Sequence, residues 1–245
     1  MLFSKSILHL YKNIKRNIFF IFLSLILFWI LSLFNTYSFV RGANFSFELL
    51  NIFLSFKSEG FISFTFLPFC LILTTILIHQ QDNPFLIVRF KTIYHYFTFK
   101  TIQIMMLSVL YVFTLTIIYF INASVFKIYT HTSFELNNYS AYLYIFYYTI
   151  ILIVSVFNIL LLQSILNIVL KNNLLSFICI IMMILLDQFL HIKLNISFIL
   201  YHGIVIKKID VLTLNTIINQ CTYNLGILCI VLVGFHHVYS KKEFH

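Results

Sequence analysis

Long apolar runs alternate with short polar segments along the whole chain. Six of these runs approach or exceed the roughly 20 residues that a helix needs to cross the hydrocarbon core of a membrane. Only helices and closed barrels satisfy their backbone in lipid, and runs of this length are helical. We therefore expect an all-α integral membrane fold in one transmembrane domain, residues 1–245. The predicted spans are 18–39, 61–78, 101–122, 141–166, 174–191 and 220–239.

The first seventeen residues carry a different pattern. Apolar and basic positions each recur at spacings of four and three, on opposite sides of a helix. This predicts a basic amphipathic helix that lies in the membrane interface. A plain positively charged anchor for the first span is the alternative. The apolar positions are Phe3, Ile7, Leu10 and Ile14, and the basic ones are Lys5, His9, Lys12 and Arg16.

The segment His79–Lys100 is the longest basic interruption between spans. Asp82 or Asn83 suits a helix N-cap, and Pro84 suits the first helical position. A run of aromatic and cationic residues follows. The pattern predicts a helical loop on the surface of the membrane domain, where an outside partner can act.

A shorter apolar segment, 194–206, precedes the last predicted span. Its 13 residues are too few to cross a membrane in the ordinary way, so we expect it to be interfacial or re-entrant. If it did span, the last helix would run in the opposite direction.

Composition supports lipid as the main solvent of this chain. Hydrophobic residues make up 61% and charged residues 9%, whereas soluble domains have about 25% charged residues. The net charge is +9, with the cations gathered at the ends of apolar runs, which indicates topology signals and headgroup contacts rather than nucleic-acid binding. Four cysteines form no CxxC pair, so no disulfide framework is expected.

The distribution of cations predicts the orientation. With the N-terminus inside, ten of the sixteen Lys and Arg residues lie in inner segments and six in outer ones. Inner loops of membrane proteins are richer in these residues, so we expect both termini in the cytoplasm.

Asp187 is the one carboxylate within a predicted span, and His191 lies one turn later on the same face. An ionisable residue in the membrane indicates function by default, such as a substrate path or a proton-linked site. The alternative is a carboxylate near the span boundary that reaches headgroup water or pairs with Lys193. Two ligands are too few for a metal, so we expect none.

The fourth predicted span carries Asn158 and Gln163. They line a polar cavity, or they form hydrogen bonds between helices. We favour the second interpretation, because amides commonly join helices in membranes. No GxxxG motif occurs, so close packing through glycine is not expected.

Motifs of catalysis are missing from the sequence. It contains no HExxH, no GxSxG and no GxxxxGK[ST]. We therefore expect no enzymatic activity and no bound cofactor, and any energy must come from a partner.

This layout resembles the membrane subunit of ABC-2-type ABC transporters, especially short bacterial permeases of peptide export and lantibiotic immunity. The resemblance implies a bacterial plasma membrane location, a second permease copy and a cytosolic ATP-binding subunit that holds the ATP. It also implies a coupling helix in the loop after the second span and an interfacial helix at the N-terminus. The loop lacks acidic residues beyond Asp82. The implied coupling residues are Asn83, Pro84, Arg89, Lys91 and His95, and those of the interfacial helix are Lys5, Lys12 and Arg16.

Three functions are consistent with these features. The first is an ATP-driven exporter of a hydrophobic or amphipathic substrate such as a peptide or lipid. The second is a stand-alone immunity or ligand-binding protein that works without an ATPase. The third is a membrane enzyme that acts on lipid through Asp187 and His191.

Overall fold

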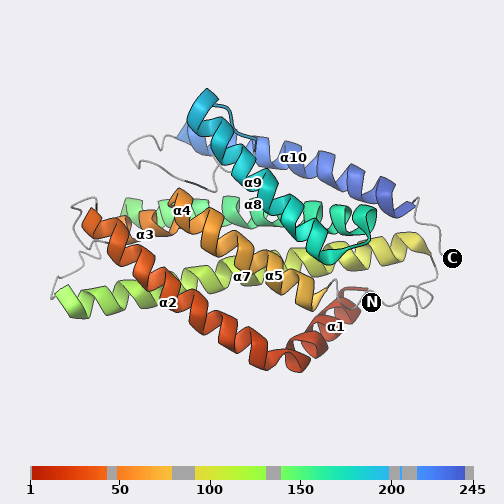
Figure 1. Ribbon diagram of the computed structural model, residues 1–245, viewed down its shortest axis with the longest axis horizontal. Helices are drawn as coiled ribbons and strands as arrows, with labels where there is room; N and C mark the ends of the chain where they lie inside the picture. Colours follow the sequence, from red (N-terminus) through yellow and green to blue (C-terminus); the bar gives the residue numbers. More distant parts are fainter. Residues whose placement is uncertain are drawn as a thin grey trace.

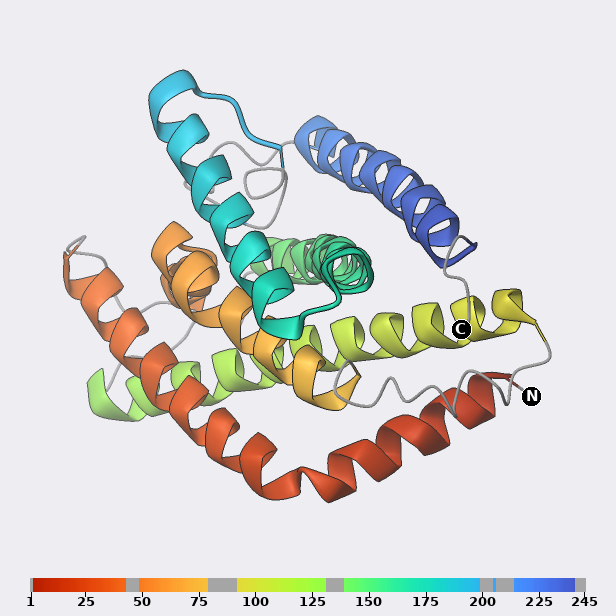
Figure 2. The same ribbon diagram turned by 45° about the vertical axis from the view of Figure 1, so that its right-hand side comes forward.

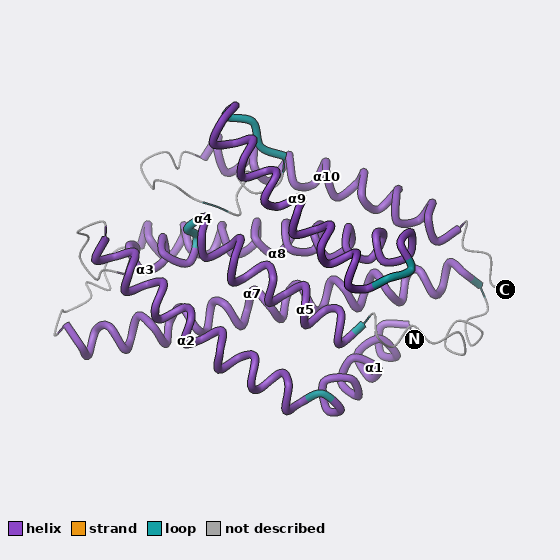
Figure 3. The backbone as a smooth tube through the Cα atoms, in the orientation of Figure 1, coloured by secondary structure: helices purple, strands orange, loops and turns teal. Residues whose placement is uncertain are grey.

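The computed structural model describes residues 2–42, 49–78, 92–130, 139–198, 205 and 214–240. This part of the chain consists of helices and short connections (Figures 1 and 3). The elements are α1 (Leu2–Arg16), α2 (Ile18–Gly42), α3 (Leu49–Phe56), α4 (Glu59–Phe61), the π-helix η1 (Ile62–Phe66), α5 (Leu67–Leu77), α7 (Ile93–Thr130), α8 (Tyr139–Leu170), α9 (Asn173–Leu194) and α10 (Leu214–Ser240).

Six helical stretches within the described residues are long and apolar enough to cross a membrane. They follow the predicted order, which confirms a multi-pass helical membrane protein. The stretches are Ile18–Gly42, Glu59–Leu77, Tyr94–Tyr129, Ile145–Leu170, Asn173–Leu194 and Ile217–Val238.

The third span differs most from its predicted bounds of 101–122. Its helix, α7, has 38 residues and is therefore about 57 Å long, well above the hydrocarbon thickness of about 30 Å. The extra turns are less apolar than the core of the span, so a search for apolar runs does not include them. They remain helical because no proline or glycine interrupts them.

The short helix α3 was not predicted. Its eight residues, LLNIFLSF, are too few to register as a span, but most of them are buried. It packs against α2 and α7 before the chain turns at Lys57 and Ser58 into α4.

The second span contains a π-turn. The N–H of Leu67 bonds to the carbonyl of Ile62, five residues back. Pro68 follows directly and has no N–H to give to a preceding carbonyl. The wider turn shifts the hydrogen-bond register just before the proline, which lets α4, η1 and α5 continue as one span.

The spans form an inner and an outer group. Most of α8 and α5 is buried, whereas α2, α9 and α10 expose most of their length. The side chains exposed on α2 are large and apolar, for example Phe19, Phe22 and Phe34. They suit contact with lipid acyl chains, so α8, with α5 and α7 beside it, forms the centre of the bundle (Figure 2).

The two ends of the bundle hold different connections. α1, the end of α5, the start of α7 and the end of α10 lie together at one end (right in Figure 1). The end of α9 and the start of α10 lie at the other end, and the two helices run in opposite directions. Residues 199–204 and 206 of the apolar segment 194–206, which is predicted to be interfacial or re-entrant, lie outside the described residues.

Hydrogen bonds between side chains join the helices. Trp29 Nε1 donates to Asn122 Oδ1 over 3.0 Å, and Asn122 Nδ2 donates to Ser32 Oγ over 3.0 Å, which joins α2 to α7. Thr74 and Tyr111 join α5 to α7 through their hydroxyl groups, 3.1 Å apart. Gly226 and Gly234 make no close helix contact, so the described spans pack through larger side chains.

Replacing Asn122 by Leu removes both bonds that join α2 to α7. We expect the free energy of unfolding to fall by about 0.6–1.7 kcal/mol, the range measured for such bonds in membranes. Reversible unfolding in mixed micelles, followed by circular dichroism, measures the loss. The control is Ser124→Ala, because the Ser124 hydroxyl is exposed and bonds only to Phe120 of its own helix. Equal losses in the two variants would contradict a specific role of Asn122.

Candidate functional site

Three helices meet where the second span ends and the third begins. We call this cluster the α1–α5–α7 junction. Its polar contacts come from both side chains and backbone carbonyls. Its members are Ser6, His9 and Asn13 of α1, Leu77 and Ile78 at the end of α5, and Phe99, Lys100 and Gln103 of α7.

The last carbonyls of α5 are bound by side chains of the other two helices. Asn13 Nδ2 donates to Leu77 O over 2.8 Å, and Lys100 Nζ donates to Ile78 O over 3.4 Å. The last carbonyls of a helix have no partner within it, and its C-terminus attracts cations. Lys100 is only 4% exposed, and its ammonium lies 5.8 Å from the centre of the Tyr96 ring. The end of α5 is thus held by α1 and α7 together.

A second set of contacts joins α1 directly to α7. Ser6 Oγ donates to Phe99 O over 3.4 Å. His9 Nδ1 lies 3.0 Å from Gln103 Nε2 and 3.2 Å from Asn13 Nδ2. Because both neighbours are amide donors, Nδ1 accepts and the ring proton is on Nε2. These bonds fix the rotation of α1 about its axis.

The structure corrects the predicted faces of α1. Leu10 is buried against the protein, and His9, which was grouped with the cations, points into the junction. Phe3 and Ile7 are exposed, as a face in the acyl layer requires. α1 therefore has a third, polar face toward α5 and α7, which a two-sided pattern does not reveal. The cations Lys5, Lys12, Lys15 and Arg16 are exposed, as expected of an interfacial helix.

The described part of the predicted coupling segment begins at Thr92. Thr92 Oγ1 accepts from His95 N over 3.3 Å, an N-cap bond that starts α7 at Ile93. Residues 93–100 therefore form the first turns of the third-span helix rather than a separate helix. His95 is exposed on the first turn. Asn83, Pro84, Arg89 and Lys91 lie outside the described residues.

Asp187 has local partners. It is 1% exposed, and it accepts from Ser197 Oγ over 3.1 Å and from Phe198 N over 2.6 Å. The Tyr223 hydroxyl donates to Phe198 O over 2.9 Å, which connects this turn to α10. The carboxylate thus orders the chain that follows α9, and because it is buried it does not reach headgroup water. Its partner is not Lys193, which is exposed and forms no ion pair with it.

His191 lies one turn after Asp187 and is partly buried. Its backbone carbonyl accepts from Asn195 N over 3.0 Å, where Asn195 ends α9 in a left-handed conformation. Among the described residues, no three His, Cys, Asp or Glu side chains lie close enough to hold a metal ion.

Asn158 and Gln163 both join helices. Asn158 Nδ2 donates to Asn224 O of α10 over 3.1 Å, and Ser155 Oγ donates to Asn224 Oδ1 over 2.8 Å. Gln163 Nε2 donates to Leu71 O over 3.2 Å and Thr75 Oγ1 over 3.0 Å, both on the α5 side. The geometry favours the packing role over a polar cavity.

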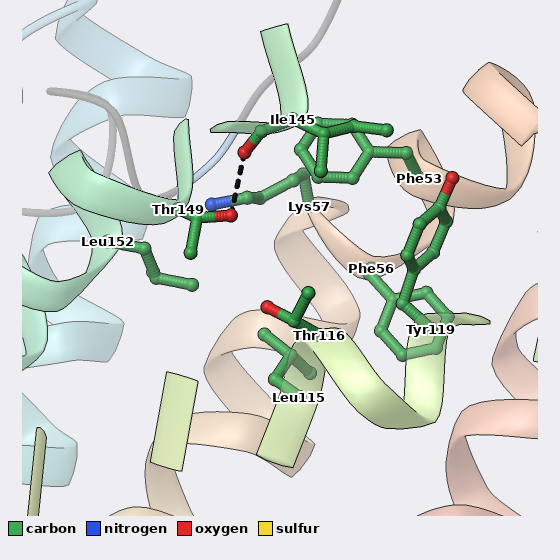
Figure 4. A pocket seen from close by; sticks show the side chains of 9 residues that line it. All are labelled: Phe53, Phe56, Lys57, Leu115, Thr116, Tyr119, Ile145, Thr149 and Leu152. Atoms are coloured by element: carbon green, nitrogen blue, oxygen red, sulfur yellow. Dashed lines mark hydrogen bonds between the residues drawn. The ribbon is translucent and has the colours of Figure 1, made fainter. Parts of the chain in front are cut away.

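Lys57 is one of the six cations in the predicted outer segments, and it is a further candidate that its position in the sequence does not single out. It follows α3, is 2% exposed, and its Nζ has no hydrogen-bond partner among the described residues. It borders a cavity of about 20 Å³, enough for one water molecule (Figure 4). Helix α3, which Lys57 follows, lies at the bundle end opposite the junction (Figure 1). The ammonium lies 5.9 Å from the ring of Phe53 and 5.8 Å from that of Tyr148. The available signal was a lysine placed directly after the apolar run 49–56.

The other polar groups of this cavity do not neutralise the lysine. Thr149 Oγ1 donates to Ile145 O over 2.6 Å, and Thr116 Oγ1 donates to Val112 O over 2.9 Å. Their protons are therefore used within their own helices. Burial lowers the pKa of the Lys57 ammonium from 10.5 to about 7, because the charged form loses its hydration.

Comparison with known proteins yields no matching family model, no matching curated protein and no matching solved structure.

The lowered pKa of Lys57 predicts a pH dependence of stability. Between pH 7 and about 10.5 the unfolded chain binds a proton that the folded chain does not, so the free energy of unfolding rises with pH. Below pH 7 both the folded and the unfolded chain carry the charge, so the folded state bears the full free-energy cost of burying the ammonium. We expect Lys57→Met, which retains the apolar stem, to unfold at a higher temperature than the parent at pH 7 and to lose this slope.

Unfolding temperatures at one scan rate, from pH 6 to 10 in detergent micelles, test this expectation. The control is Lys193→Met, which changes an exposed lysine near the end of α9. Parallel pH profiles for the parent and Lys57→Met would show that Lys57 stays protonated in the folded protein.

Proposed function

We propose that this chain is the membrane-spanning permease subunit of an ATP-driven exporter, which moves a hydrophobic or amphipathic substrate. The energy comes from a separate cytosolic ATPase, and two permease copies or two similar chains form the pathway. The proposal joins the resemblance to ABC-2-type permeases with the geometry of the α1–α5–α7 junction.

The junction is the observation that carries the proposal. The segment 79–91 connects α5 to α7, and both helices are bonded to α1 beside that segment. A partner that displaces the segment therefore displaces three helices together. Such a rigid connection suits a protein whose driving force is applied from outside the chain.

The length of α7 supports the same function. It extends from the junction to the opposite end of the bundle, and just past its middle it borders the Lys57 cavity through Leu115, Thr116 and Tyr119 (Figures 1 and 4). A tilt of α7 at the junction would displace both ends of this helix. A helix of this kind can convert closure of an ATPase into rearrangement of the far side.

The character of the spans favours an apolar or amphipathic cargo. The outer helices α2, α9 and α10 expose large apolar side chains, and the described amides Asn122, Asn158 and Gln163 are used to join helices. A strongly hydrated solute would find few polar groups to replace its water.

Copurification tests the proposed partner. We expect the tagged chain, solubilised from its native membrane, to retain a P-loop ATPase, and Arg89→Glu with Lys91→Glu to release it by charge reversal at the connecting segment. Mass spectrometry of the purified complex is the measurement. Activity that needs no nucleotide, with no ATPase retained, would instead favour the stand-alone immunity protein.

The junction provides a separate test of coupling. Asn13→Leu removes the bond from α1 to the end of α5, so we expect the ATPase to remain bound while ATP-driven transport falls roughly threefold or more, as loss of one interhelical bond predicts. The matched control is Thr98→Ala, because Thr98 Oγ1 bonds only to Tyr94 O of its own helix. Unchanged transport in Asn13→Leu would show that the junction does not transmit force.

A further inference from the structure

α2 and α7 diverge beyond the point where they are bonded. They meet where Trp29 and Ser32 bind Asn122, and their far ends then separate (Figures 1 and 2). One turn past these bonds lies a groove of about 420 Å³, open toward the surroundings. We call it the α2–α7 groove. Its lining residues are Leu33, Phe34 and Tyr37 of α2 and Val125, Phe126 and Tyr129 of α7.

The groove suits hydrocarbon. All six lining side chains are apolar or aromatic, and its volume lies within the range of small-molecule sites, roughly 300–1,000 Å³. Phe34 is 73% exposed and Tyr129 is 67% exposed, so the opening faces sideways, where a membrane would place acyl chains. The nearest polar groups one turn away, on Trp29 and Asn122, already bind each other. The part of a ligand that occupies the groove must therefore be apolar.

A cation, Arg41, lies one turn beyond the last groove residue of α2. Arg41 is exposed, lies on the same face of α2 as Tyr37 one turn later, and holds its guanidinium 5.0 Å from the centre of the Tyr37 ring. The helical rise puts it about 6 Å beyond Tyr37 and about 18 Å from Trp29 along the axis. A guanidinium is the side chain best suited to bidentate binding of phosphate. Among the described residues, no carboxylate pairs with Arg41.

We propose that the α2–α7 groove binds one anionic phospholipid of the adjacent leaflet. An acyl chain lies between the two helices, and the lipid phosphate contacts Arg41. The order of an apolar groove followed by a cation matches the order of acyl chain and phosphate in a phospholipid. The last turn of α7 carries one cation, Lys127. It lies about 150° around the helix axis from the mean direction of Val125 and Phe126, so it does not face the groove.

The chain carries a reporter for this site. Trp29 is the sole tryptophan and lies one helical turn before Leu33, the first groove residue of α2. The experiment reconstitutes the purified chain in phosphatidylcholine vesicles and adds phosphatidylglycerol or phosphatidylcholine whose acyl chains are brominated near the middle. Bromine quenches tryptophan fluorescence on contact. We expect brominated phosphatidylglycerol to quench at roughly fivefold lower mole fraction, the scale of one cation–lipid contact at a membrane surface.

Three variants assign the effect to this groove. Arg41→Gln should abolish the preference for phosphatidylglycerol, Lys127→Gln should retain it, and Val125→Phe should reduce quenching by both lipids because it fills the groove. Equal quenching by the two lipids in the parent would overturn the proposal, as would equal loss in Arg41→Gln and Lys127→Gln. Quenching that disappears as the protein-to-lipid ratio rises would show that a second copy covers the groove, which also overturns it. No ATPase is needed, so the result is independent of the proposed transport function.

Discussion

The structure depends on hydrogen bonds that must be made inside the protein because lipid offers none. In the hydrocarbon layer, apolar surface alone gives little reason for two helices to associate, since acyl chains are equally apolar. Amides, hydroxyls and one indole therefore define which helices meet: Trp29 with Asn122, Thr74 with Tyr111, Gln163 with the α5 backbone, and Asn158 with Asn224. The large aromatic and aliphatic side chains then fill the space around these contacts.

The two ends of the bundle apply this constraint differently. At the α1–α5–α7 junction, the carbonyls at the end of α5 receive donors from two other helices. At the opposite end, Lys57 is buried without a hydrogen-bond partner among the described residues, beside a cavity that fits one water molecule. The first arrangement pairs both carbonyls, although Gln103 Oε1 beside them has no hydrogen-bond partner among the described residues, whereas the second leaves the Lys57 Nζ buried without one, which costs stability.

Several parts of the candidate sites were predictable from the residues alone. The basic face of α1 follows from the spacing of Lys5, Lys12 and Arg16, and Asp187 stands out as a carboxylate in an apolar run. The contacts were not predictable, because Asn13 and Leu77 are 64 residues apart and Trp29 and Asn122 are 93 residues apart. No local sequence pattern predicts such pairs. Lys57 was overlooked for the same reason, since its burial depends on α7 and α8 as well as on its chain neighbours Phe53 and Phe56.

The sequence by itself determined the number, order and approximate position of the spans and the amphipathic N-terminal helix. Each of these follows from hydropathy and periodicity, which are local properties. They determine directly whether a segment or a helix face prefers lipid or water. Only the tertiary structure decided that His9 faces α7, that Asp187 holds the chain after α9, that α2 and α7 part to leave a groove below Arg41, and that Lys57 is enclosed. Those features depend on which helices meet and at what rotation. That choice is made by a few distant polar pairs that periodicity cannot distinguish from any others.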